Sequence, residues 1–68
     1  MKRIILIGSG NVASHLGFTL KKSNYQITQV YSREFENAKK LAERLGADAT
    51  NKFQALKTAD LIIVSVTD

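Results

Sequence analysis

The chain alternates short apolar runs with stretches of helical periodicity. Residues 4–7 form an unbroken apolar run that stops at a glycine-rich segment, which is typical of a strand buried on both faces. Over residues 11–22, Val12, Leu16 and Leu20 recur at a spacing of four, and two lysines end the segment. This spacing predicts a helix whose apolar stripe faces the core and whose last turn carries favourable positive charge.

The middle of the chain repeats this pattern of strand and helix. Residues 25–32 are rich in β-forming residues and alternate in part, which predicts a second strand. Residues 34–45 predict a second helix, because acidic residues lie in its first turn, Gly46 follows its end and its apolar residues share one face. Those apolar residues are Phe35, Ala38, Leu41, Ala42 and Leu45.

The remaining residues predict shorter elements that complete a parallel sheet. Residues 47–50 predict a brief strand, residues 53–57 a single helical turn, and residues 61–66 a fourth, buried strand. The order β-α-β-α-β-(α)-β implies an α/β fold, a doubly wound parallel sheet with right-handed crossovers. Both longer helices would share one face, which leaves the other face short of cover. Since parallel sheets are normally covered on both faces, we expect a fragment of a longer domain.

The composition limits the size of the domain, its partners and its cellular location. The chain has 68 residues, a formal net charge of +4, 44% hydrophobic residues and no cysteine. It is at most one small domain, and a solitary core of this size is marginal. The basic residues are scattered without a long run, so no nucleic-acid partner is expected. Because its apolar runs are too short for a signal peptide or a membrane span, we expect a cytoplasmic protein with no membrane partner.

Residues 8–13 (GSGNVA) match G-x-G-x-x-G/A directly after the first predicted strand. In dinucleotide-binding turns the first glycine allows a sharp bend, the second admits a pyrophosphate, and the small last residue lets the helix pack closely. The helix that follows has no acid in its first turn, which suits phosphate binding by backbone N–H groups. Alternatively, the glycines serve only the geometry of a tight turn. The predicted phosphate-binding residues are Gly8, Ser9, Gly10, Asn11 and Val12.

The end of the second predicted strand indicates which dinucleotide binds. NAD-binding domains place an acid there for the ribose 2′-hydroxyl, whereas this chain has Ser32 and Arg33. A hydroxyl and a guanidinium suit a 2′-phosphate, so NADP is favoured over NAD as the cofactor. Alternatively, Ser32 only caps the second helix and Arg33 is solvated, or Glu34 turns back toward the ribose. Val66 and Thr67, at the end of the fourth strand, are candidates for the nicotinamide-ribose side.

The segments IILIGSGNVASHLGFTL, YSR and ADLIIVSV resemble the amino-terminal Rossmann domain of the pyrroline-5-carboxylate reductase and deazaflavin-dependent NADP oxidoreductase superfamily. The resemblance implies that residues 1–68 are the amino-terminal part of an NADP-binding Rossmann domain, with Ser32 and Arg33 on the 2′-phosphate. It also implies a catalytic and dimerisation domain, absent from this chain, and a homodimer of the full-length protein. This chain departs from some relatives at Asn37, where they have a basic residue. It also departs at residues 65–68 (SVTD), where relatives often have Ala-Val-Lys-Pro or similar, which argues against a close match to the proline-forming enzymes.

The expected function is that of the cofactor half of an NADP-dependent oxidoreductase, which transfers hydride between the nicotinamide and an unidentified small-molecule substrate. The sequence identifies no catalytic residue and no metal site. His15, the single histidine, is expected to be exposed because it lies off the apolar stripe. Two alternatives are a non-catalytic nucleotide-sensing domain of the same fold and a methyltransferase that binds S-adenosylmethionine. Both usually keep an acid after the second strand.

Overall fold

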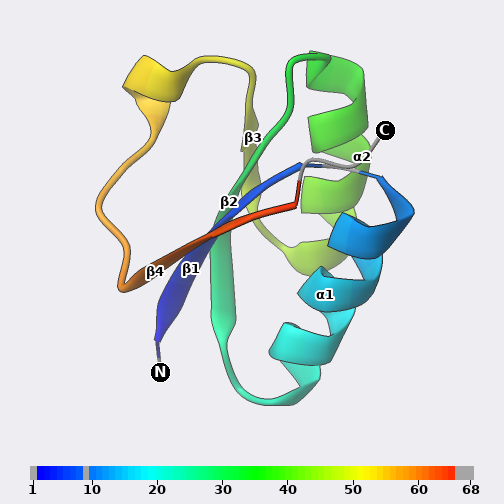
Figure 1. Cartoon of the computed structure of the whole chain (residues 1–68), viewed down its shortest axis with the longest axis vertical. Helices are drawn as coiled ribbons and strands as arrows, with labels where there is room; N and C mark the ends of the chain where they lie inside the picture. The colour runs from blue at the N-terminus through cyan, green and yellow to red at the C-terminus, as the bar shows by residue number, and fades with distance from the viewer. Residues whose placement is uncertain (1, 9, 66–68) are drawn as a thin grey trace.

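The computed structural model describes residues 2–8 and 10–65 and shows a parallel four-stranded sheet with helices in its connections (Figure 1). The elements are β1 (Arg3–Ile7), α1 (Asn11–Lys22), β2 (Gln26–Tyr31), α2 (Phe35–Leu45), β3 (Asp48–Thr50), the short 3₁₀ helix η1 (Phe53–Ala55) and β4 (Leu61–Val64). The strands stand in the order β3-β2-β1-β4, so the direction of winding reverses between β1 and β4. The predicted α/β class, a partial doubly wound Rossmann sheet, is confirmed.

The two long helices share one face of the sheet, as predicted, and η1 lies on the other side (Figure 1). Buried residues from β1, β2, α1 and α2 form one hydrophobic core under the helices. They are Ile4, Leu6, Ala13, Ile27, Val30, Ala38, Leu41, Ala42 and Leu45. The core therefore joins the sheet to the two helices, and the crossover from β3 to β4 stands apart from it.

β1 is the central strand, paired with β2 at one edge and with β4 at the other, and its side chains are buried on both faces, as its apolar run predicted. Ile4 and Leu6 belong to the core under the helices. Ile5 and Ile7 are also buried but lie outside that core, since alternate side chains of a strand point to opposite faces. The central strand therefore needs cover on both faces of the sheet.

An irregularity in β2 explains why its sequence alternates only in part. The pairing with β1 advances from Ile27 directly to Gln29 and skips Thr28. The Thr28 hydroxyl instead donates a hydrogen bond to the carbonyl oxygen of Ile4 at 3.3 Å. Ile27 and Val30 both reach the core as a result, although a regular strand would send them to opposite faces.

The face that α1 buries differs from the predicted one. Ala13 and Gly17 are its buried residues, whereas Val12 is 49% exposed. A Cβ atom at Gly17 would lie 2.8 Å from Cδ1 of Leu45, so the absence of a side chain lets α1 lie close to its neighbours. The expected stripe is confirmed at Leu20, which packs against the core, but it is wrong at Val12, because the small residues Ala13 and Gly17 make the closest approach of the helix to the sheet and to α2.

α2 buries its predicted apolar face except at Phe35, which is 43% exposed. Phe35 is the first residue of the helix and stands past the carboxyl end of β2, beyond the part of the sheet that covers the rest of this face. The helix ends before Gly46, as predicted. The φ of Gly46 is 70°, in the left-handed region that suits glycine after a helix.

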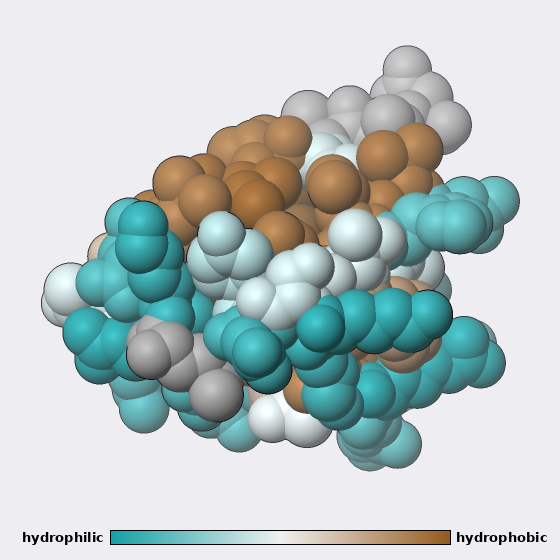
Figure 2. All heavy atoms as spheres, turned by 90° about the horizontal axis from the view of Figure 1, so that it is seen from below, coloured by the Kyte–Doolittle hydropathy of each residue, from teal (hydrophilic) through white to brown (hydrophobic). Residues whose placement is uncertain are grey.

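β4 is an exposed edge strand, and the prediction that it is buried is wrong. Leu61, Ile62 and Val64 are all at least half exposed, because β4 pairs with β1 alone among the described strands. Figure 2 shows hydrophobic atoms gathered on one face of the molecule. The predicted shortage of cover on the second face agrees with this exposure. Within the described ranges, no helix has the length and apolar character needed to cross a membrane.

Candidate functional site

The carboxyl ends of β1 and β4 meet at Gly8 and Ser65. The backbone N–H of Ser65 donates to the carbonyl oxygen of Ile7 at 2.7 Å, which holds the two chain segments together past the end of β4. Gly8 has a φ of 127°, and a Cβ atom there would collide with the carbonyl oxygen of Ser65. Only glycine fits this position without strain, as expected for the first glycine of a phosphate-binding turn.

A backbone hydrogen bond joins this turn to the end of β2. The N–H of Gly8 donates to the carbonyl oxygen of Tyr31 at 2.8 Å. Tyr31 directly precedes Ser32 and Arg33, so the glycine turn and the predicted 2′-phosphate residues lie at the same edge of the sheet. Two parts of the site that are far apart in the sequence are thus brought together.

The amino-terminal end of α1 has the features of an anion-binding helix end. Gly10 is its N-cap residue, no side chain of the described residues caps it, and no acidic residue lies in its first turn. The first backbone N–H groups of a helix lack acceptors within the helix and favour a bound anion. Asn11 and Val12 supply two of these groups, whereas Ser9 lies outside the described residues. Gly10 is extended, with φ −77° and ψ −170°, so its backbone does not itself require glycine.

The Ser65 hydroxyl is a buried polar group beside this turn. Ser65 is 8% exposed, and its side-chain oxygen has no hydrogen-bond partner in the part of the chain that the structure describes. A buried hydroxyl left unpaired costs about 1–3 kcal/mol, so this position suits a ligand or water that bonds to it. Its role was not anticipated from the sequence, where the only signal is a polar residue after an apolar run. Val66 and Thr67 lie outside the described residues.

Ser32 and Arg33 lie in the connection between β2 and α2. The N-cap residue of α2 is Glu34, so the interpretation of Ser32 as the helix cap is wrong. The Ser32 hydroxyl accepts a hydrogen bond from the N–H of Glu34 at 3.4 Å. The Glu34 carboxylate accepts a hydrogen bond from the side-chain amide of Asn37 at 3.1 Å, which holds it over the first turn of α2.

Arg33 is exposed at the carboxyl edge of the sheet. Among the described residues no carboxylate lies within ion-pair distance of it. The ion pair that does form joins Arg3 to Asp60, 3.9 Å apart, where β1 and β4 begin. The guanidinium of Arg33 is therefore available for a charge-assisted hydrogen bond to a phosphate.

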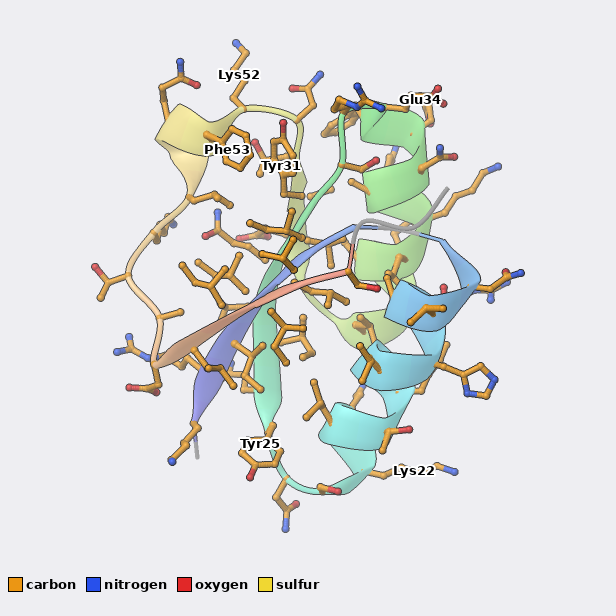
Figure 3. The ribbon with its side chains drawn as sticks, in the orientation of Figure 1. Lys22, Tyr25, Tyr31, Glu34, Lys52 and Phe53 are labelled. Carbon is orange, nitrogen blue, oxygen red and sulfur yellow. The ribbon has the colours of Figure 1, made fainter. Side chains whose placement is uncertain are left out.

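Two contacts that were not anticipated from the sequence hold the crossover from β3 to β4 against the second face of the sheet. The rings of Tyr31 and Phe53 stack with centroids 4.2 Å apart (Figure 3). The buried side chain of Gln29 donates to the carbonyl oxygen of Ala55 at 3.0 Å and accepts from the N–H of Lys57 at 2.8 Å. The signal available in the sequence was a glutamine inside an apolar strand. Its partners could not be predicted, because they lie far along the chain.

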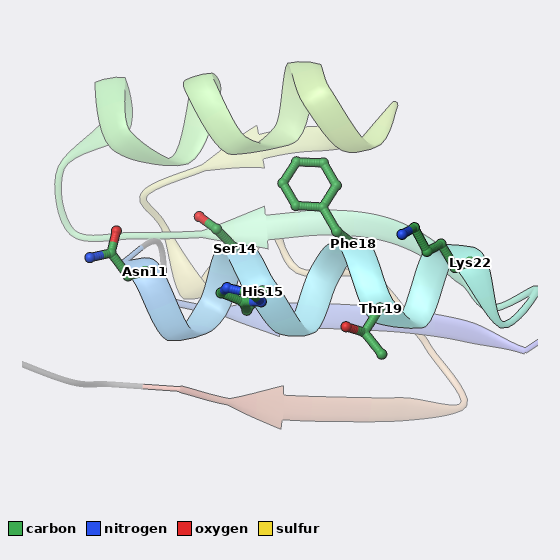
Figure 4. Close-up of a pocket in the computed structure, with 6 residues that line it drawn as sticks. All are labelled: Asn11, Ser14, His15, Phe18, Thr19 and Lys22. Carbon is green, nitrogen blue, oxygen red and sulfur yellow. The ribbon is translucent and has the colours of Figure 1, made fainter.

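A hollow runs along the outer surface of α1 (Figure 4). Its lining residues are Asn11, Ser14, His15, Phe18, Thr19 and Lys22. Of these, only Asn11 belongs to the predicted cofactor site, so the hollow follows the helix surface and not the carboxyl edge of the sheet. His15 is exposed there, as predicted. The described residues contain no group of His, Cys, Asp and Glu that could hold a metal ion.

The strand order and the glycine turn define a Rossmann-like α/β domain. A family model described as NADP oxidoreductase, coenzyme F420-dependent, matches residues 3–67. The chain therefore belongs to this family, which confirms the resemblance seen in its sequence.

Similar proteins support the family and the fold. A Bacteroides fragilis protein, provisionally described as an NADP oxidoreductase, is 40% identical, with a TM-score of 0.92 over 98% of this chain and 26% of its own. The glutamyl-tRNA reductase of Methanocaldococcus jannaschii is 39% identical over 66 residues, covering 91% of this chain and 17% of the reductase. The WlbA dehydrogenase of Chromobacterium violaceum, solved with NADH and UDP-GlcNAcA, shares the fold at 24% identity, with a TM-score of 0.85 over 96% of this chain and 20% of its own. The chain thus spans no more than 26% of any of these three proteins.

Proposed function

We propose that the chain binds NADP(H) as the cofactor part of an oxidoreductase that transfers hydride between the nicotinamide and a small-molecule substrate. The hydrogen bond from Gly8 to Tyr31 carries this proposal, because it joins the glycine turn to the segment that holds Ser32 and Arg33. One edge of the sheet thereby offers donors for a pyrophosphate and for a 2′-phosphate. Membership of a family of NADP oxidoreductases supports the same function.

The pyrophosphate would bind at the first turn of α1. The backbone N–H groups of Asn11 and Val12 are donors there, and within residues 2–8 and 10–65 no capping side chain and no first-turn acid competes with the anion. Gly10 leaves the backbone open to the approach of the phosphates. The Ser65 hydroxyl, buried beside Gly8 without a partner among the described residues, fits as a further donor at this end of the site.

The 2′-phosphate would bind to the Ser32 hydroxyl and the Arg33 guanidinium, and Val66 and Thr67 would lie toward the nicotinamide ribose. The nicotinamide supplies or accepts the hydride. This chain's residues bind and orient the cofactor, while the choice of substrate, the catalytic groups and the contacts of a homodimer belong to further domains. This division agrees with the share of the Bacteroides fragilis relative that the chain spans, 26%. We place the protein in the cytoplasm.

A side-by-side titration of NADPH and NADH with the full chain, at one low salt concentration, tests the proposal. Hydrogen bonds to a charged group contribute about 1.5–3 kcal/mol, so NADPH should bind about tenfold more tightly or better. Arg33→Ala should remove this preference. Gly10→Val should weaken both cofactors alike, because valine tolerates the extended backbone of Gly10 but blocks the pyrophosphate.

Circular dichroism shows in each case whether the variant is folded. Equal binding of the two cofactors by the folded wild-type chain would refute the 2′-phosphate site. Unchanged binding by Gly10→Val would refute the pyrophosphate site. Absence of binding to either cofactor would favour a nucleotide sensor of the same fold, with another ligand.

A further inference from the structure

The segment after β3 is tied by two contacts to the end of β2. The backbone N–H of Ser32 donates to the carbonyl oxygen of Thr50 at 3.1 Å. Slightly further along, the ring of Phe53 stacks on the ring of Tyr31 at a centroid distance of 4.2 Å. Lys52 stands between these two contacts in the sequence, so its backbone is held beside the segment that carries the proposed 2′-phosphate residues.

The side chain of Thr50 fixes the backbone of Lys52. Its hydroxyl oxygen accepts a hydrogen bond from the N–H of Lys52 at 3.1 Å and lies 3.4 Å from the carbonyl oxygen of Lys52, to which the hydroxyl donates. Lys52 is extended and exposed. Figure 3 shows Lys52 and Phe53 at the end of the molecule where Tyr31 lies, with Lys22 at the opposite end. A lysine with a fixed backbone therefore stands at the carboxyl edge of the sheet.

The charges around Lys52 suit an anion. In the described ranges, neither Lys52 nor Arg33 has a carboxylate within ion-pair distance. Glu34, the acid next to Arg33 in the sequence, is engaged by the amide of Asn37. Two cations thus follow the ends of neighbouring strands, Arg33 after β2 and Lys52 after β3, and neither has a charged partner in the part of the chain that the structure describes.

We infer that Lys52 is a second cationic ligand of the cofactor's 2′-phosphate and thereby helps the site to select NADP over NAD. The inference rests on the proposed function. A phosphate monoester carries close to two negative charges near neutral pH and offers three acceptor oxygens, so it can bind two cations at once. Arginine supplies a rigid, directional fork, and lysine a compact charge on a flexible stem that can adapt to the ligand.

Adenosine 2′,5′-bisphosphate and adenosine 5′-monophosphate differ only by the 2′-phosphate, so the ratio of their affinities measures recognition of that group. In titrations of the full chain at one low salt concentration, Lys52→Gln should lower this ratio about three- to tenfold. The affinity for the monophosphate should stay the same, and Lys52→Arg should retain most of the ratio. The thermal midpoint should not change, since the bonds to Thr50 use only main-chain atoms of Lys52.

Lys22→Gln is the matched control, because it removes an equal charge at the opposite end of the molecule. It should leave the ratio unchanged, and an equal fall for this variant would reduce the effect to general electrostatic attraction and overturn the inference. An unchanged ratio in Lys52→Gln, combined with a lowered ratio in Arg33→Ala, would overturn the role of Lys52 alone. A wild-type ratio near one would overturn both this inference and the proposed NADP site.

Discussion

The two faces of the sheet are covered in different ways. Under the helices, small residues such as Ala13 and Gly17 let α1 lie close to the sheet, and the core is apolar throughout. On the second face, the crossover from β3 to β4 is held by one buried glutamine and one pair of stacked rings. β4 adds Ile62 and Val64 there, and each is more than half exposed.

This difference separates the residues that stabilise the fold from the residues that are proposed to bind the cofactor. Close apolar packing contributes most of the free energy of a small fold, so the helix face should hold the chain together. Residues that bind a ligand must stay accessible to it, so the residues of the proposed cofactor site lie at the carboxyl edge instead. Gly8, Ser32, Arg33 and Ser65 all lie there. Substitutions on the two faces and at the edge should therefore have distinguishable effects.

The largest expected effect is on the helix face. Leu41 is 4% exposed in the core, and Leu41→Ala should lower the free energy of unfolding by about 2–5 kcal/mol, enough to unfold much of a marginal chain. Ile62 is 51% exposed on β4, and Ile62→Ala should cost about 1 kcal/mol or less. Urea denaturation followed by circular dichroism measures both. Equal losses would mean that the second face contributes as much to stability as the first.

The next largest effect concerns the hydrogen bonds that hold the crossover from β3 to β4 against the second face of the sheet. Gln29→Met keeps the length of the side chain but leaves the Ala55 carbonyl and the Lys57 N–H without their partner. The cost should be about 1–3 kcal/mol, measured by urea denaturation. Gln26→Met, the same change at an exposed position of β2, is the control and should have little effect. If the two variants behave alike, the hydrogen bonds of Gln29 do not hold the crossover.

Local patterns in the sequence were sufficient for the elements and for the glycine turn. The apolar run of β1, the periodicity of α2 and the glycines after β1 are each contained in a short stretch, and each was found where predicted. The buried face of α1 was not predicted correctly, because spacing identifies apolar residues but not the neighbours that they meet. Val12 is apolar and exposed, while Gly17 is buried against Leu45.

The residues of the proposed site that the sequence did not indicate depend on strand order for their positions. Lys52 gains its place only because β3 pairs with β2, and Ser65 only because β4 lies beside β1. Both contacts join segments that are distant in the sequence, and neither residue belongs to a recognisable motif. Ser32 and Arg33 could be proposed from the sequence, because their residue type and their place after a strand are local features.

The smallest expected effects concern Ser65. Its substitution should preserve or raise the stability of the fold but lower the affinity for the cofactor. Because its buried hydroxyl has no partner in the described part of the chain, Ser65→Ala should leave the free energy of unfolding unchanged or raise it by up to about 1 kcal/mol. The same variant should bind NADPH and NADH about threefold more weakly, and equally so, since Ser65 lies beside Gly8 and not beside Arg33. Urea denaturation and parallel titrations measure the two effects. A loss of stability would mean that the hydroxyl supports the fold, and unchanged affinity would remove it from the pyrophosphate end of the site.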